Sequence, residues 1–166
     1  MGVTNINKFF YLILSLSLFA GLYFGEDSAG SGGFIMDFNH TWPLVENPFR
    51  SDFTAYDFKF PLHYYIASAA YFVLNDKNYL RFFYCLVALL TQYIFYVCLK
   101  KKFKETDKNN LFFFSLIILM LPSVRSAAIW PNTQITAIFF FLIATYYFIN
   151  WELKKNYNYL NKDLFL

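Results

Sequence analysis

Two adjacent acids, Glu26 and Asp27, directly follow the first long apolar run of the chain. If that run crosses a membrane, both carboxylates lie at the membrane edge, where a lipid-linked substrate presents its headgroup. A carboxylate there could accept a proton from an attacking hydroxyl group, or bind a divalent cation through its oxygens. The alternative is a polar rim after a membrane helix, and these two residues alone do not decide between the interpretations.

A second group of polar residues surrounds Pro61 in the stretch KFPLHYY, residues 59–65. Lys59 and His63 flank this proline, which is predicted to open a helix. At the membrane surface both side chains could hold a lipid phosphate, helped by the free amides and dipole of the helix N-terminus. The alternative is interfacial anchoring, because Lys side chains snorkel and aromatic rings prefer the headgroup level.

A third polar group lies in residues 122–134, between two later apolar runs. Arg125 could be a second phosphate ligand or an anchor at the end of a membrane helix. Asn132 follows Pro131 directly, and it is predicted to cap the last long helix, because short polar side chains are favoured just before the first helical residue.

The composition indicates the kind of molecule that must position these residues. The chain has 166 residues, of which 58% are hydrophobic, 24% aromatic and 15% charged, whereas soluble domains average roughly 25% charged residues. This balance excludes a disordered tail and argues against an ordinary soluble domain. A formal charge of +3 is too small to indicate a nucleic-acid partner.

The apolar excess is concentrated in long runs, which predict membrane-spanning helices of roughly 17–25 residues. The first run exceeds the roughly 7–15 apolar residues of a signal peptide, and no small-residue cleavage site follows it. We therefore expect an all-α, polytopic membrane bundle that forms one domain over residues 1–166. Its four predicted spans cover residues 9–24, 79–99, 110–124 and 134–151.

Charge placement predicts the topology of this bundle. Residues 61–74 form an apolar segment that is too short for a span and suits a helix lying along the outer surface. With that segment outside, nine basic residues share one side, which the positive-inside rule assigns to the cytoplasm. Both termini are then cytoplasmic, and an outer loop with juxtamembrane helices covers residues 25–78. The nine are Lys8, Lys100, Lys101, Lys102, Lys104, Lys108, Lys154, Lys155 and Lys162.

The order of these features resembles the integral-membrane glycosyltransferases of the GT-C class. This class includes the protein O-mannosyltransferases, the aminoarabinose transferase of lipid A and the bacterial RgtA/B/C/D-like family. The acidic pair of this class is similar to Glu26-Asp27, and its stretch of the kind (H/K)PPLxYY is similar to residues 59–65. The class then has a span that starts near an Arg and ends in a basic turn, which is similar to Arg81 and residues 99–103. The later outer turn is similar to residues 121–127.

Three departures limit the resemblance. Phe60 replaces the first proline of the double proline. Asn132 stands in the later outer turn, where many members carry a second acid, so a second catalytic or metal-binding carboxylate is in doubt. Members of the class are several times longer, and we expect this chain to correspond to their N-terminal part.

The resemblance implies sugar transfer from a polyprenyl-phosphate-linked donor to a lipid, glycan or protein acceptor. The reaction would take place on the extracytoplasmic face of a bacterial inner membrane. Asp27 would be the catalytic base, supported by Glu26, while Lys59, His63 and Arg125 would bind the donor phosphate. No cofactor is certain, although a divalent cation with Asp27 as a ligand is an option.

Two other classes of protein stay open. The first is a non-catalytic polytopic protein, such as a transporter or an assembly subunit. The interiors of the apolar runs hold almost no charges, which argues against a transporter. An O-antigen polymerase or ligase typically relies on arginine-rich outer loops. The predicted outer loop is acidic instead, since it holds seven of the eleven acids: Glu26, Asp27, Asp37, Glu46, Asp52, Asp57 and Asp76.

Overall fold

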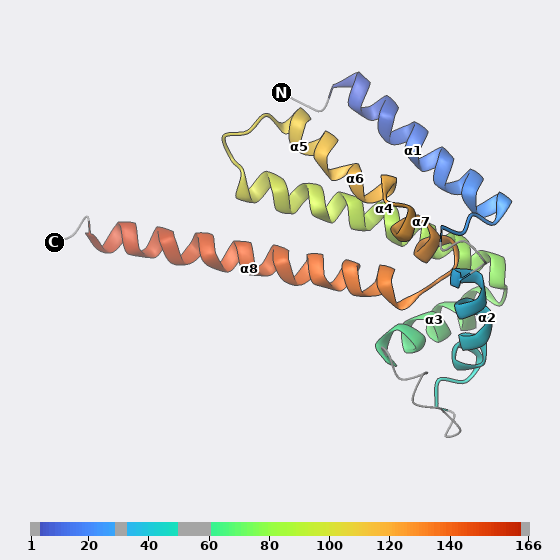
Figure 1. Cartoon of the computed structure of the whole chain (residues 1–166). Coiled ribbons are helices and arrows are strands. Elements are labelled where there is room, and N and C mark those ends of the chain that lie inside the picture. The colour runs from blue at the N-terminus through green and yellow to red at the C-terminus, as the bar shows by residue number, and fades with distance from the viewer. Residues whose placement is uncertain (1–3, 29–32, 50–60, 164–166) are drawn as a thin grey trace.

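The computed structural model describes residues 4–28, 33–49 and 61–163, and within this part of the chain every regular element is a helix (Figure 1). The predicted all-α class is therefore confirmed. Three helices are much longer than the others and lie lengthwise in the molecule. They are α1 (Asn5–Phe24), α4 (Lys77–Lys102) and α8 (Thr133–Asp163).

Among the described residues, α1, α4 and the Thr133–Lys155 part of α8 are each long and apolar enough to cross a membrane. The predicted spans 9–24, 79–99 and 134–151 fall within these three helices. Many large apolar side chains remain exposed on them, as expected for surfaces that contact lipid. Examples are Phe9, Leu12, Leu86, Leu90, Phe141 and Phe148.

The predicted span over residues 110–124 is not one straight helix. The chain there forms α5 (Lys108–Ser115), α6 (Ile117–Met120) and α7 (Pro122–Ile129). The direction changes by 61° between Lys108–Met120 and Pro122–Ile129. Pro122 causes the break, because proline disfavours the helical conformation of the preceding residue, and Leu121 is extended with ψ 117°. The described chain thus has three candidate spans, or four if this bent pair counts as one.

The segment between α1 and α4 holds two shorter helices, α2 (Gly33–Glu46) and α3 (Pro61–Leu74). As predicted, α3 begins at Pro61 and its apolar length stays below that of a span.

The sequence did not predict α2, because Pro43 lies inside it. Aromatic contacts pack α2 against α3 and against Trp130 at the end of α7. The ring of Trp42 lies 4.9 Å from that of Tyr71 in α3, and the ring of Phe38 lies 5.9 Å from that of Trp130.

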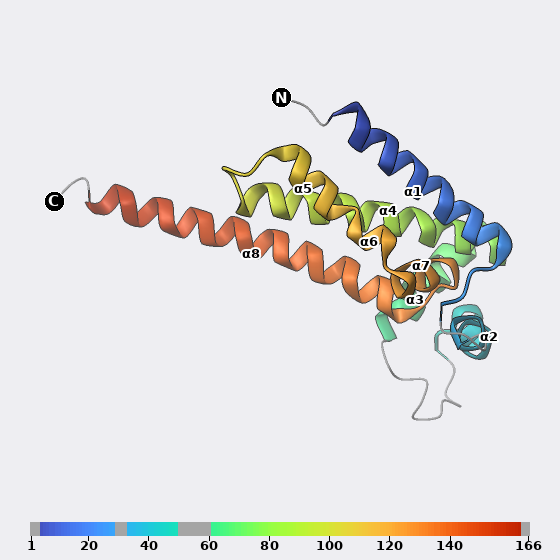
Figure 2. The ribbon, with the colours of Figure 1, turned by 45° about the horizontal axis from the view of Figure 1, so that its top comes forward.

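The long helices separate two ends of the molecule, as Figures 1 and 2 both show. One end, the lysine end, holds the start of α1, the end of α4, the start of α5 and the C-terminal part of α8. Its basic residues include the lysines of residues 100–108 and Lys154 and Lys155. The opposite end, the Glu26 end, holds the end of α1 together with α2, α3 and α7. The acidic pair and most of the basic residues therefore lie at opposite ends of the long helices.

Candidate functional site

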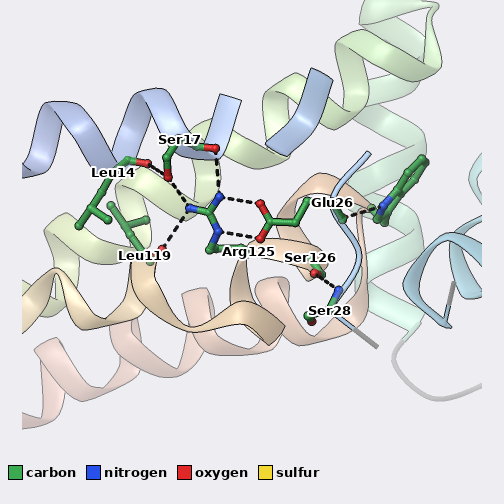
Figure 3. A network of polar contacts seen from close by, with 8 residues as sticks. Leu14, Ser17, Glu26, Ser28, Leu119, Arg125 and Ser126 are labelled. Carbon is green, nitrogen blue, oxygen red and sulfur yellow. Dashed lines mark hydrogen bonds and ion pairs between the residues drawn. The ribbon is translucent and has the colours of Figure 1, made fainter. Parts of the chain in front are cut away.

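The Glu26 end is organised around an ion pair between Glu26 and Arg125 of α7 (Figure 3). Arg125 Nε donates to Glu26 Oε1 at 2.8 Å, and Nη2 donates to Oε2 at 2.6 Å. This bidentate geometry is the strong form of an arginine–carboxylate contact. Arg125 is 13% exposed and Glu26 32% exposed, so the pair is partly shielded from solvent.

The remaining donors of Arg125 are also used within the chain. Nη1 donates to Ser17 Oγ at 2.9 Å and to the Leu119 carbonyl at 3.5 Å, and Nη2 donates to the Ser17 carbonyl at 3.0 Å. Together with the two bonds to Glu26, these contacts occupy all five N–H donors of a guanidinium group. Arg125 of α7 thereby contacts α1, the segment that follows α1, and α6.

Two glycines of α1 make this arrangement possible. Gly25 ends the helix in the left-handed conformation with φ 71°, which glycine adopts without steric cost. The following N–H of Glu26 donates to the Gly21 carbonyl at 2.8 Å, a pattern typical of helix C-termini. A Cβ atom on Gly21 would clash with Glu26 Oε2, so a larger residue at position 21 would displace the end of the Glu26 side chain from its present position.

Asp27 has a different environment from its neighbour. Its Oδ2 accepts the N–H of Ile35, in the first turn of α2, at 2.9 Å. An acid at this place satisfies a free amide and interacts favourably with the helix dipole. The next residue, Ser28, donates its N–H to Ser126 Oγ of α7 at 2.8 Å. Both acids are therefore held in defined positions, Glu26 by α7 and Asp27 by α2.

A second arginine, Arg81 of α4, ties the same helix ends together. Its Nε donates to the Ile129 carbonyl at 2.8 Å and its Nη2 to the Leu22 carbonyl at 3.2 Å. These carbonyls lie in the last turns of α7 and α1, where they lack helical partners. The guanidinium carbon lies 3.8 Å from the centroid of the Trp130 ring, and Trp130 Nε1 donates to the Glu26 carbonyl at 3.1 Å.

His63 lies apart from this cluster, inside the protein. It is 2% exposed, and its Nδ1 is 2.8 Å from Thr136 Oγ1 of α8 and 3.4 Å from the Tyr84 hydroxyl of α4. Burial lowers the pKa of His63 to about 4, because the charged imidazolium loses its hydration. The neutral ring therefore joins α3, α4 and α8 through a buried polar contact.

The structure thus brings together three of the five predicted site residues, Glu26, Asp27 and Arg125. His63 lies in a separate buried contact, and Lys59 lies outside the described residues. Asp27 is the residue that the sequence offers as an optional ligand of a divalent cation. In the described part of the chain no group of three His, Cys, Asp or Glu side chains could hold a metal ion.

Sequence reasoning found the Asn132 cap but missed several residues of the Glu26 end. Asn132 Oδ1 accepts the N–H of Gln134 at the start of α8 at 3.3 Å, which confirms the predicted cap. Ser17 and Gly21 were missed, although they lie four residues apart within an apolar run. That spacing puts two small residues on one helix face and is a usable signal for close approach of another helix.

Over the residues that the structure describes, the chain is all-helical, with three, or up to four, helices long and apolar enough to cross a membrane and with an arginine–carboxylate cluster at one end. These features are consistent with a multi-pass membrane protein. Comparison of the chain with family models, curated proteins and solved structures found no match.

Proposed function

We propose that the chain is the N-terminal part of a GT-C-type membrane glycosyltransferase. It would transfer a sugar from a polyprenyl-phosphate-linked donor to a lipid, glycan or protein acceptor. The observation that supports this proposal is the gathering of Glu26, Asp27 and Arg125 at the end of α1 opposite the lysine end. Fixed carboxylates at the edge of a membrane helix are suited to a substrate whose reactive headgroup lies at the bilayer surface.

In this proposal Asp27 is the base that accepts the proton of the acceptor hydroxyl. Its Oδ2 is oriented by the Ile35 N–H at 2.9 Å, and base catalysis requires a carboxylate held within hydrogen-bond reach of the proton. The ion pair of Glu26 with Arg125 fixes the backbone immediately before Asp27. Glu26 therefore supports the base without itself taking the proton.

Lys59, His63 and Arg125 are the proposed contacts of the donor phosphate. His63 is buried, so its contact would require that its side chain become accessible. Glu26 already occupies two of the N–H donors of Arg125. To bind Arg125, the donor phosphate would therefore have to replace the Glu26 carboxylate.

The proposed orientation follows from the two ends of the molecule. The positive-inside rule assigns the lysine end to the cytoplasm, so both ends of the described chain would be cytoplasmic and Asp27 would face the outside. In a bacterium this arrangement corresponds to the inner membrane.

A second candidate function is a non-catalytic membrane subunit. The observation that favours it is that Arg125 uses all five donors on groups of its own chain. The contact of Asp27 with Ile35 likewise serves helix capping. In that case the cluster would only fasten α1, α2 and α7 together.

The first function is tested by measuring sugar transfer from polyprenyl-phosphate donors, in membranes that contain the protein expressed from the complete reading frame. Asp27→Asn should lower turnover by about 10²–10⁴-fold, the usual contribution of a general base. Asn caps helices as well as Asp does, so α2 should stay folded. Lys59→Ala should mainly raise the KM for the donor, because it removes a binding contact.

The matched control is Asp37→Asn, which removes an exposed carboxylate from α2 and should leave turnover unchanged. If Asp27→Asn turns over like the wild type at equal protein level, the base assignment is wrong. The non-catalytic function would then be the better account of the cluster.

A further inference from the structure

A groove between α4 and α8, on the side of the lysine end, has no role in the proposed function. Its volume is about 440 Å³, within the range of roughly 300–1,000 Å³ that small-molecule sites occupy. Both helices contribute three apolar or aromatic residues to its walls. These are Tyr93, Ile94 and Val97 of α4, and Ile143, Tyr146 and Tyr147 of α8.

The groove leads directly to basic side chains, because residues three, four or seven apart share one face of a helix. On α4, Lys100 and Lys101 follow Val97 by three and four residues. On α8, Asn150 follows Tyr147 by three residues, and Lys154 lies one turn further on. The apolar walls of both helices therefore end in polar, mostly cationic residues.

Contacts of Lys101 place a positive charge at this end of the groove. Lys101 Nζ donates to Asn150 Oδ1 and lies 4.3 Å from the centroid of the Tyr146 ring. Glu152, also on α8, is paired with Lys102 at 2.9 Å, so its charge is compensated. Lys100 and Lys154 are exposed and add to the positive potential.

We propose that this groove binds an anionic diacyl phospholipid. One acyl chain lies between α4 and α8 against Val97 and Tyr147, and the phosphate group is held by Lys100 and Lys101. Basic pockets between membrane helices are known to select anionic headgroups, and each lysine near the surface contributes about 1 kcal/mol. The tyrosine rings suit the headgroup level. The proposal depends on α4 and α8 crossing the membrane, and it is independent of sugar transfer.

Native mass spectrometry of the purified full chain in detergent tests the proposal. The probes are phosphatidylglycerol and phosphatidylcholine with identical acyl chains. We expect one tightly retained phosphatidylglycerol and weaker retention of phosphatidylcholine. Lys100→Gln, at an exposed position, should weaken phosphatidylglycerol binding about fivefold. Lys100→Gln combined with Lys101→Gln should weaken it up to roughly 30-fold, because each lysine contributes about 1 kcal/mol.

The matched control is the pair Lys104→Gln and Lys108→Gln, which changes the charge equally but lies beyond the groove. It should weaken phosphatidylglycerol binding less than twofold. An equal loss in both pairs would mean general surface attraction and would overturn the proposal. Equal retention of the two lipids by the wild type would overturn it as well.

A second variant tests the acyl-chain half of the proposal without changing any charge. Val97→Trp should fill the groove and reduce retention of both lipids, whereas Phe113→Trp at an exposed position of α5 should not. If Val97→Trp retains phosphatidylglycerol like the wild type, no chain lies in the groove and the proposed site is wrong.

Discussion

Arg125 is the side chain on which the arrangement of the Glu26 end depends most. Replacing it with Met removes five hydrogen bonds and leaves the Glu26 carboxylate without its cation. Loss of one partner of a buried pair costs about 3–5 kcal/mol, and we expect the lower value because Glu26 is 32% exposed. Thermal unfolding in detergent can be followed with a thiol-reactive dye, since Cys85 and Cys98 are both buried and free.

The control for this prediction is the exposed pair of Lys102 and Glu152, whose side chains are 49% and 36% exposed. Exposed ion pairs contribute at most about 1 kcal/mol, so Lys102→Met should shift the melting temperature far less than Arg125→Met. Combining Arg125→Met with Glu26→Gln should recover part of the lost stability. Equal shifts for Arg125→Met and Lys102→Met would contradict the role given to Arg125.

The lowered pKa of the buried His63 predicts that the stability of the fold depends on pH. The unfolded chain binds a proton on this ring below about pH 6.5, whereas the folded chain binds it only near pH 4. Between these values the unfolded state holds more protons, so the free energy of unfolding falls as the pH is lowered through this window. The total loss should be about 3 kcal/mol, at 1.36 kcal/mol for each pKa unit.

Melting temperatures measured from pH 7 to pH 4 check this prediction. His63→Gln keeps a polar group near Thr136 and removes the titration, so its profile should be flatter than that of the wild type. A wild-type slope that His63→Gln does not reduce would show that another group carries the effect.

At the scale of single helices, two aspartates at helix starts form a natural comparison. Asp76 caps α4, because its Oδ1 accepts the N–H groups of Asn78 at 2.7 Å and Tyr79 at 3.1 Å. Asp107 has the same position before α5 but makes no capping hydrogen bond through its side chain. Asp76→Ala should therefore lower stability by about 1 kcal/mol, and Asp107→Ala by much less. The thiol-dye melting assay compares the two variants, and equal losses would contradict the capping argument.

The extent of the helices could be predicted from the sequence only where local signals agree. Long apolar runs correctly predicted α1, α4 and α8, and Pro61 and Asn132 correctly marked the starts of α3 and α8. The bent segment was missed because Leu121 and Pro122 are apolar and extend the hydrophobic run, while the proline changes the backbone. The helix α2 was not predicted, because Pro43 is locally unfavourable to a helix. Its aromatic contacts with distant residues cannot be read from the local sequence.

At the scale of the whole molecule, the candidate site depends on contacts between distant parts of the chain. Glu26 and Arg125 are 99 residues apart, and no periodicity in one sequence relates positions that far from each other. Glu26, Asp27 and Arg125 could each be predicted as candidate site residues, because they are polar residues beside apolar runs. Their pairing follows only from how α1 packs against α7, and the burial of His63 away from them follows from how α3 packs against α4 and α8.

The charge distribution, in contrast, is visible in the sequence because the positive-inside rule acts on local clusters. The lysines of residues 100–108 and of the last helix do lie at one end of the long helices, opposite Glu26 (Figure 1). Both the proposed sugar transfer and the proposed lipid site require that these ends face opposite sides of a membrane.

Cysteine labelling in intact cells tests that requirement most directly. Single cysteines are introduced at Asn39 in α2 and at Glu105 between α4 and α5, in a chain with Cys85→Ala and Cys98→Ala. Both chosen positions are exposed. A membrane-impermeant maleimide should label position 39 in intact cells and position 105 only after lysis. Labelling of position 105 but not position 39 in intact cells would contradict the topology, and with it the extracytoplasmic placement of Asp27.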